Sequence, residues 1–326
     1  MSMIQGDRRL MMTEKKEKNI SDLFTGYLAC LATRNAPSYD HVERVLNRVQ
    51  DALGNNMPIN EVSSESICNI LAQVYMNGSK AHAAWIRQLL NSVWRWGMRV
   101  SSDYRIHNAT NYGINCNPVE SIPSDTHSLS ASRERFLSEN ELPGYLRFLQ
   151  NTSNHPASGA LLIALLTGSR IEEIANMKVS DFDNEMGTIY FPKTKTGNSH
   201  KIGLGQWALS ILREKSTGKL NNAYIFPSVR NQEKSISNNS IYVFFCKAHL
   251  KNACPRDSRR TFKTLAQVAG LKRETLDLIQ NHRDGTIASK HYDKFFATPE
   301  AIIQMRDALN VWERWLLGIQ RQKMVA

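Results

Sequence analysis

Five residues in the second half of the chain have the types and the order that attack on a phosphodiester by a tyrosine requires: Arg170, Lys195, Arg259, His282 and Tyr292. A tyrosine oxygen can displace an alcohol from phosphorus and hold the phosphate covalently, which preserves the bond energy for religation. Guanidinium groups bind phosphate oxygens through paired hydrogen bonds and stay charged near neutral pH, so they can stabilise the charge that develops. The set therefore predicts phosphoryl transfer without a metal ion.

Each member of the set has a distinct expected role. Tyr292 is the candidate nucleophile, and Arg170 and Arg259 are candidate donors to the nonbridging oxygens. Lys195 is the candidate general acid for the leaving 5′ oxygen, because neighbouring Arg charges would lower its pKa. Lys193 is the alternative acid. A phosphodiester exchange therefore has a nucleophile, an acid and two anion donors in this sequence.

His282 and three further residues complete the candidate site. His282 could donate a hydrogen bond to a nonbridging oxygen, and Glu173, one helical turn beyond Arg170, could orient that arginine. Asp257 is expected to support the site. Arg256 adds a cation three positions before Arg259. Tyr242, the other tyrosine near these motifs, lies in an apolar run and is expected to be part of the core.

The local sequences carry more information than the residue types. Arg170 lies in TGSRIEEI, Lys195 in KTKTG and Arg259 in RDSRRT, and His282 precedes Tyr292 by ten positions. In the order of these motifs and in their residues, the chain resembles the tyrosine site-specific recombinases, the family of phage integrases, Xer proteins and Cre. The resemblance covers roughly residues 137–296 and, more loosely, the region before residue 118.

This resemblance implies a fold, a reaction and a set of partners. The fold would be mainly α with a small antiparallel β-sheet (α+β), arranged as a two-domain, C-shaped DNA clamp. The reaction would be site-specific recombination of double-stranded DNA through a 3′-phosphotyrosyl intermediate and a Holliday junction. The partners would be specific recombination sites and a homotetramer on two of them, to which accessory DNA-bending proteins could be added. Neither a metal nor another cofactor is implied.

Three positions depart from the usual pattern of that family. Arg256 stands where the family usually has His, and it cannot shuttle a proton near neutral pH, although it could contact phosphate. Asn281 stands where the family usually has Gly. The spacing from His282 to Tyr292 is one residue longer than the commonest one.

Two other functions stay open at this point. A type IB topoisomerase or a telomere-resolvase-like enzyme shares the nucleophile and the cations. The departures at Arg256 and Asn281 would also suit a catalytically decayed, architectural DNA-binding protein.

Length and charge agree with a nucleic-acid partner. The chain has 326 residues, enough for two domains, and 41 Lys plus Arg against 30 Asp plus Glu give a formal net charge of +11. Such an excess favours a polyanion, because each neutralised phosphate releases counterions, although charge alone also fits an ordinary basic protein. No apolar run approaches the ~18 residues of a membrane span, and no secretory signal is evident. We expect a cytoplasmic protein that associates with the nucleoid when bound to DNA.

The N-terminal region is expected to form a helical core-DNA-binding domain over residues 19–117, after a flexible basic tail at 1–18. Apolar residues recur at helical spacing from Asn19 to about Arg99, with breaks near Gly54 and Gly78. The last of these helices carries cations that could contact phosphates or simply face water: Lys80, Arg87, Arg95 and Arg99.

A linker is expected at residues 118–135, because serine, proline and polar residues replace apolar ones there. A catalytic domain would follow at residues 136–297. It would open with a Ser138–Glu141 capping box, contain a buried helix over 160–166, and place Lys195 between strands at 188–191 and 201–204. Helices are expected over 207–215, 240–248, 260–269 and 273–280.

The C-terminal segment, residues 298–326, carries an apolar stripe at alternate steps of three and four: Ile302, Met305, Leu309, Trp312, Leu316 and Ile319. The stripe alone favours packing of this helix on its own domain. The family resemblance instead favours its exchange between protomers. The five scattered cysteines predict neither a zinc site nor a disulfide framework, and we expect them to be reduced and mostly buried.

Overall fold

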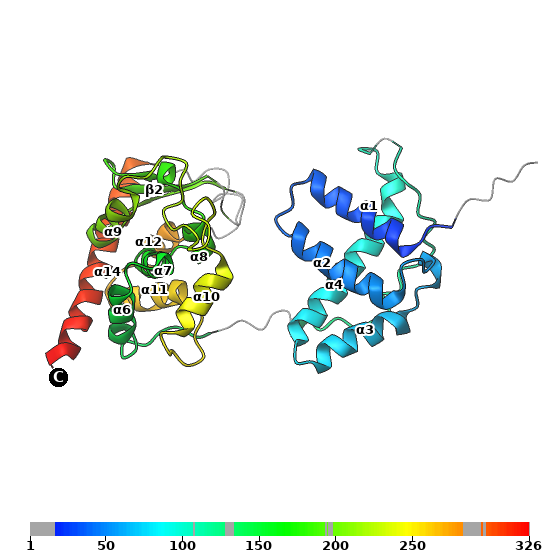
Figure 1. Cartoon of the computed structure of the whole chain (residues 1–326), viewed down its shortest axis with the longest axis horizontal. Coiled ribbons are helices and arrows are strands. Elements are labelled where there is room, and N and C mark those ends of the chain that lie inside the picture. Colours follow the sequence, from blue (N-terminus) through cyan, green and yellow to red (C-terminus); the bar gives the residue numbers. More distant parts are fainter. Residues whose placement is uncertain are drawn as a thin grey trace, which may run out of the picture. The chain divides into compact units, whose positions relative to one another are not determined.

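The computed structural model describes residues 17–106, 108–127, 134–192, 194, 198–282, 295 and 298–325. The chain divides between residues 133 and 134 into two compact units, both drawn in Figure 1. Helices dominate the described residues, and the named strands form one three-stranded antiparallel sheet. The expected fold class, mainly α with a small antiparallel sheet, is confirmed. None of the described helices is long and apolar enough to cross a membrane.

In its described residues the N-terminal unit contains a bundle of four helices: α1 (Ile20–Thr33), α2 (Tyr39–Leu53), α3 (Ser64–Met76) and α4 (Lys80–Arg99), with short 3-10 turns η1 (Ile59–Glu61) and η2 (Val100–Ser102). Asn19 and Asp22 form a capping box that begins α1. The apolar faces meet around Trp94 of α4, which is fully buried and stacks edge-on against Phe24 of α1. The helical periodicity of the sequence therefore predicted this bundle correctly.

Residues 118–122, expected in the linker, pack instead on the N-terminal unit. Val119 and Ile122 are buried in its core. Arg87 of α4 donates to the carbonyl oxygens of both residues, at 3.3 Å to Val119 and 2.6 Å from Nη2 to Ile122. Two apolar side chains among polar neighbours were sufficient to hold this segment, because a guanidinium satisfies its backbone acceptors.

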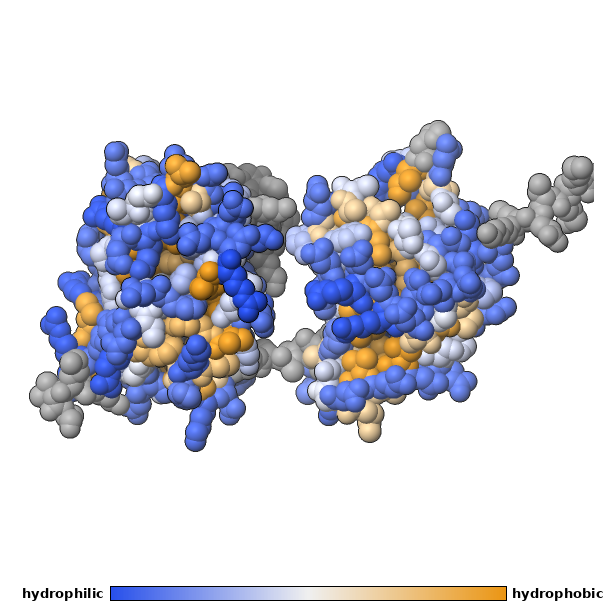
Figure 2. Space-filling view, in the orientation of Figure 1, coloured by the Kyte–Doolittle hydropathy of each residue, from blue (hydrophilic) through white to orange (hydrophobic). Residues whose placement is uncertain are grey.

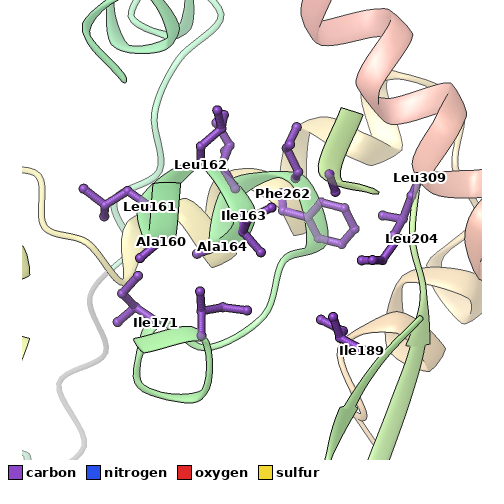
Figure 3. Packing of buried hydrophobic residues seen from close by; sticks show 14 of the residues in the cluster. Ala160, Leu161, Leu162, Ile163, Ala164, Ile171, Ile189, Leu204, Phe262 and Leu309 are labelled. Carbon is purple, nitrogen blue, oxygen red and sulfur yellow. The ribbon is translucent and has the colours of Figure 1, made fainter. Parts of the chain in front are cut away.

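The described part of the C-terminal unit contains these helices: α6 (Leu142–Asn151), α7 (Pro156–Thr167), α8 (Ile171–Ala175), α9 (Gln206–Ser216), α10 (Asn238–Cys246), α11 (Asp257–Val268), α12 (Arg273–Ile279) and α14 (Pro299–Val325), with the 3-10 turn η3 (Val179–Asp181). Helix α7 is apolar on every side and lies in the middle of this unit (Figure 1). Its residues pack with Ile171, Ile189, Phe262 and Leu309 from four other elements (Figure 3). A helix that is apolar all round must be enclosed in this way.

The sheet has the strand order β1 (Phe182–Asp183), β2 (Thr188–Phe191) and β3 (His200–Gly203). Phe191 pairs with His200 at the end of the β2–β3 ladder, so residues 192–199 connect these strands. His200 is buried, and its Nε2 lies 2.9 Å from the carbonyl oxygen of Ile279 in α12. This contact joins the hairpin to the helix that precedes His282.

Helix α14 packs on its own unit in this single chain, as the apolar stripe alone favours, and its exchange between protomers stays a prediction. Met305, Leu309, Trp312 and Leu316 are fully buried in the hydrophobic core of the C-terminal unit. Trp312 Nε1 donates to the carbonyl oxygen of Leu165, and Glu313 accepts from two backbone N–H groups at the start of α9. Those two amides have no partner inside α9, so a carboxylate from α14 satisfies them.

Two other expectations about burial are wrong. The five cysteines are free, but three are exposed and two are half-buried. Tyr242 is 50% exposed, because α10 buries Ile241, Phe244 and Phe245 on its other face. Hydrophilic residues cover much of the visible surface of each unit, with apolar side chains in smaller patches (Figure 2).

Candidate functional site

The turn that carries Arg170 joins α7 to α8. Helix α7 ends at Thr167, and Gly168 takes a left-handed conformation with φ of +62°. A Cβ at this position would lie 2.2 Å from Phe262 of α11, so the turn requires a residue without a side chain. Thr167 and Ser169 are buried and their hydroxyls are hydrogen-bonded to each other. The turn is therefore fixed by packing before Arg170 begins α8.

Arg170 is oriented by Glu173, as expected from their spacing. Its Nη1 donates to Glu173 Oε1 at 3.0 Å, and its backbone N donates to Oε2 at 3.4 Å. Both side chains are largely shielded from solvent, with 22% and 13% of their surfaces exposed. One carboxylate thus caps α8 and holds the guanidinium beside it.

Arg259 of α11 is held by the turn at Gly168 and by the end of α12. Its Nη1 donates to the Gly168 carbonyl oxygen at 2.7 Å, and its Nη2 donates to the Gln280 carbonyl oxygen at 2.8 Å. Nη2 also lies 2.8 Å from Nε2 of His282. A guanidinium has five N–H bonds, and within the described residues two of those of Arg259 remain for a ligand.

The electrostatics of Arg259 are unusual for an arginine. Burial, followed by the like charge of Arg170, lowers the pKa of Arg259 to about 10, and Glu173 opposes this shift. It remains protonated near neutral pH. Two guanidiniums that repel each other in a partly buried place form a site that an anion would stabilise.

Gln280, which follows α12, links the Gly168 turn to α11 through a buried side chain. It is buried, and its Nε2 donates to the carbonyl oxygens of Gly168 and Arg259. Its Oε1 has no hydrogen-bond partner among the described residues. Sequence reasoning missed this residue, and nothing in its spacing would have indicated it.

The backbone at the end of α12 explains why Asn281 can replace glycine. Asn281 has a φ of +52°, in the left-handed region that Gly adopts freely and Asn tolerates better than most residues. The N–H of Asn281 donates to Leu278 O, and the N–H of His282 donates to Asp277 O at 2.8 Å. This pair of bonds is a Schellman motif. It fixes the position of the His282 backbone relative to α12.

The His282 side chain lies among three charged groups. Besides Arg259 at Nε2, its Nδ1 lies 3.3 Å from Asp277 Oδ1 and 3.1 Å from Lys263 Nζ. Lys263 Nζ also donates to Asp277 Oδ1 at 2.6 Å. Burial, followed by the charges of Arg259 and Lys263, lowers the pKa of His282. The ring is therefore neutral near pH 7.

Arg256 and Asp257 lie at the start of α11. Arg256 is paired with Glu172 of α8, with Nη2 2.7 Å from Oε1, and its side chain is 75% exposed. Asp257 is fully buried and accepts from Cys254 N and from Arg260 Nη1. Asp257 supports the first turn of the helix that presents Arg259, and Arg256 extends the cationic surface toward solvent.

Comparison with known proteins shows which family has a similar sequence. The model of the phage integrase family matches residues 135–297. The chain belongs to the phage integrase family. The prophage integrase IntF of Escherichia coli (strain K12) is 26% identical over 200 residues, which cover 58% of this chain and 41% of that protein. The chain thus spans less than half the length of this relative.

Solved integrase structures share the fold. A lambda integrase (75–356) dimer bound to a COC′ core site has a TM-score of 0.61 at 18% identity, covering 85% of this chain and 98% of that one. A lambda integrase tetramer bound to a Holliday junction gives 0.62 at 19% identity, covering 86% and 78%. The Tn1549 transposon integrase in complex with a circular intermediate DNA gives 0.58 at 17% identity, covering 81% and 91%.

The described part of this integrase-family chain brings together Arg170, Glu173, Arg259 and His282. Lys195, its alternative Lys193, and Tyr292 lie outside the described residues, so their positions stay predictions. The described residues contain no group of three or more His, Cys, Asp or Glu that could hold a metal ion.

The cations proposed for the N-terminal unit of this integrase-family chain are used in different ways. Arg87 has a structural role, since its Nε and Nη2 donate to backbone carbonyls, and its contact with phosphate stays a prediction. Arg95 pairs with Glu120 at the surface, and Lys80 lies over the ring of Tyr75. Arg99 is exposed.

Proposed function

We propose that this protein is a site-specific DNA recombinase that breaks and rejoins strands through Tyr292. The observation that carries the proposal is the convergence of two guanidiniums, Arg170 and Arg259, beside the Gly168 turn in a chain of the phage integrase family. Membership of the family and the net charge of +11 support DNA as the partner.

The chemistry would proceed by in-line displacement at phosphorus. The Tyr292 hydroxyl loses its proton to solvent as its oxygen forms a bond to phosphorus, the bond to the 5′ oxygen breaks, and Lys195 gives that oxygen a proton. Arg170 and Arg259 stabilise the charge on the nonbridging oxygens. In the reverse step a 5′ hydroxyl attacks the 3′-phosphotyrosyl bond and releases Tyr292. No water or external energy source is consumed.

Trapping on a nicked suicide substrate tests the nucleophile. The substrate carries the DNA that flanks this gene, where an integrase site is expected, and loss of the short strand prevents religation. The wild-type chain should give a covalent protein–DNA adduct, whereas Tyr292→Phe should give none. Tyr242→Phe is the matched control, because Tyr242 is an exposed tyrosine of the same unit. An adduct that survives in Tyr292→Phe and disappears in Tyr242→Phe would reassign the nucleophile.

The same assay separates the other functions. A topoisomerase or resolvase would relax supercoiled plasmid without paired sites. An architectural protein would bind DNA tightly, with strong salt dependence, and never form an adduct.

We propose further that four protomers act on two DNA sites, with the two units of each protomer clamping the duplex. Accessory DNA-bending proteins could assist. Because α14 packs on its own unit, we expect the free chain to be monomeric and assembly to depend on DNA. Sedimentation of the chain with and without substrate measures this, and a stable tetramer without DNA would contradict it.

A further inference from the structure

Two residues outside the predicted set, Lys263 and Asp277, surround the ring of His282. Lys263 lies one helical turn after Arg259 on α11, and Asp277 lies on α12, whose Schellman end places His282. Asp277 is also 3.7 Å from Arg273. Among the described residues, the charged groups that face the ring are therefore Arg259 on one side and the Lys263–Asp277 pair, with Arg273 behind it, on the other.

The neutral His282 ring has one nitrogen lone pair that can accept a hydrogen bond, and two cationic donors lie within reach of the ring nitrogens. Arg259 Nη2 lies 2.8 Å from Nε2, and Lys263 Nζ lies 3.1 Å from Nδ1. Both cations are donors only, so a single tautomer cannot accept from both. If Nε2 accepts from Arg259, the ring hydrogen is on Nδ1; if Nδ1 accepts from Lys263, the hydrogen is on Nε2 and faces an Arg259 N–H.

Asp277 decides between the two tautomers. Its Oδ1 lies 3.3 Å from Nδ1 and can accept the ring hydrogen there. The same oxygen accepts from Lys263 at 2.6 Å, so the ammonium has an acceptor other than the ring. In the Nδ1–H tautomer the ring N–H and the Lys263 ammonium lie 3.1 Å apart but share the Asp277 oxygen as acceptor, whereas in the Nε2–H tautomer the ring N–H faces the Arg259 N–H at 2.8 Å with no acceptor between them among the described residues.

We propose that Lys263 and Asp277 are positioning residues that fix His282 as its Nδ1–H tautomer, so that its Nε2 accepts from Arg259 and orients that guanidinium. The proposal rests on the proposed function, because it concerns an arginine that would bind the phosphate. In the DNA-free protein His282 then serves Arg259 as an acceptor, in contrast to the phosphate donor that sequence alone suggested. The network extends the site to groups that touch no substrate.

The first test reads the tautomer directly in the full-length chain without DNA. Two-bond 1H–15N spectra of 15N-histidine-labelled protein distinguish a protonated from an unprotonated ring nitrogen, and His282→Gln assigns the signal. In the wild type, Nδ1 should be protonated and Nε2 unprotonated. Protonation at Nε2, or at both nitrogens near pH 7.5, would overturn the proposal.

Variants make the prediction sharper. In Asp277→Ala, Lys263 loses its acceptor and should donate to Nδ1, so the hydrogen should move to Nε2. Adding Lys263→Met removes that donor, and the double variant should return to the Nδ1–H tautomer. Structural damage alone would not be reversed by a second substitution. Asp277→Leu replaces Asp277→Ala if the smaller side chain prevents folding. Glu274→Gln, at an exposed carboxylate of the same helix, should leave the spectrum unchanged.

Cleavage adds a second readout. Asp277→Ala should slow single-turnover adduct formation by up to about a hundredfold, through misplacement of Arg259, and the double variant should recover most of that loss. Equal rates in wild type and Asp277→Ala, with the tautomer changed, would show that His282 does not position Arg259 for the reaction. If the wild type forms no adduct, the proposed function fails while the tautomer measurement still decides the assignment around His282.

Discussion

Arg87 in the N-terminal unit and Arg259 in the C-terminal unit make similar hydrogen bonds in very different surroundings. Each donates to two backbone carbonyl oxygens, Arg87 to Val119 and Ile122, and Arg259 to Gly168 and Gln280. The surroundings of Arg259 also include the like charge of Arg170 and the ring of His282. Carbonyl bonds alone therefore indicate a structural arginine, whereas a second guanidinium beside it indicates an anion site.

Replacement of each arginine by lysine should give the largest contrast. Lysine keeps the charge but loses the fork that binds an anion bidentately. Arg259→Lys should slow adduct formation by about 10² to 10³, the usual loss for one preorganised anion donor, whereas Arg87→Lys should leave the rate at saturating DNA unchanged. Arg87→Lys should instead destabilise the N-terminal unit by about 1–2 kcal/mol, because carbonyl bonds are lost. Single-turnover trapping and urea unfolding measure the two effects. Equal slowing by both variants would place Arg87 at the DNA.

Substitution in the Gly168 turn, which binds Arg259, should have an effect nearly as large, but on stability and not on the reaction rate. Gly168→Ala combines a φ of +62° with a Cβ placed 2.2 Å from Phe262, so we expect a loss of about 2–3 kcal/mol in the unfolding free energy of the C-terminal unit. Gly144→Ala is the control, because its Cβ would meet no atom within 4 Å and alanine favours the helix. Equal unfolding free energies for the two variants in urea would mean that the Gly168 turn does not depend on a residue without a side chain.

The features of this structure that could be predicted from the sequence are those that depend on apolar periodicity and on short local motifs. The four N-terminal helices, the buried helix α7 and strands β2 and β3 follow from apolar spacing. Arg170 and Arg259 were recognisable because each lies in a run of residues resembling the family. Asn281 could be noted as a departure, but its left-handed conformation could not be read from one residue type.

The remaining features depend on contacts between distant segments. Lys263 and Asp277 are 14 positions apart and meet only because α11 and α12 pack together. The side of helix α14 that is buried could be predicted, but its partner could not, since the same stripe fits its own unit or a neighbour. Burial of Val119 and Ile122 likewise depends on Arg87, about 30 residues earlier in the chain.

An added anion should distinguish the two arginines without mutation. Sulfate between Arg170 and Arg259 would relieve their repulsion, so a concentration of ten times its Kd should add about 1.4 kcal/mol to the stability of the C-terminal unit. Hydrogen exchange should slow around residues 168–175 and 259–282 and stay unchanged around Arg87. Chloride at equal ionic strength is the control for screening. A sulfate effect that persists in Arg170→Met would mean that the anion binds elsewhere.

The smallest expected effect compares two asparagines with left-handed backbones, Asn281 beside the site and Asn108 in the N-terminal unit, with φ of +52° and +54°. Asn281→Gly should stabilise the C-terminal unit by about 1 kcal/mol, since it relieves left-handed strain and removes a buried Nδ2 that has no partner among the described residues. Asn108 is exposed, so Asn108→Gly should change stability by only a few tenths of a kcal/mol. Thermal unfolding of both variants measures the difference. A loss of stability in Asn281→Gly would mean that the amide side chain itself holds His282, and that asparagine is more than a tolerated substitute for glycine at this turn.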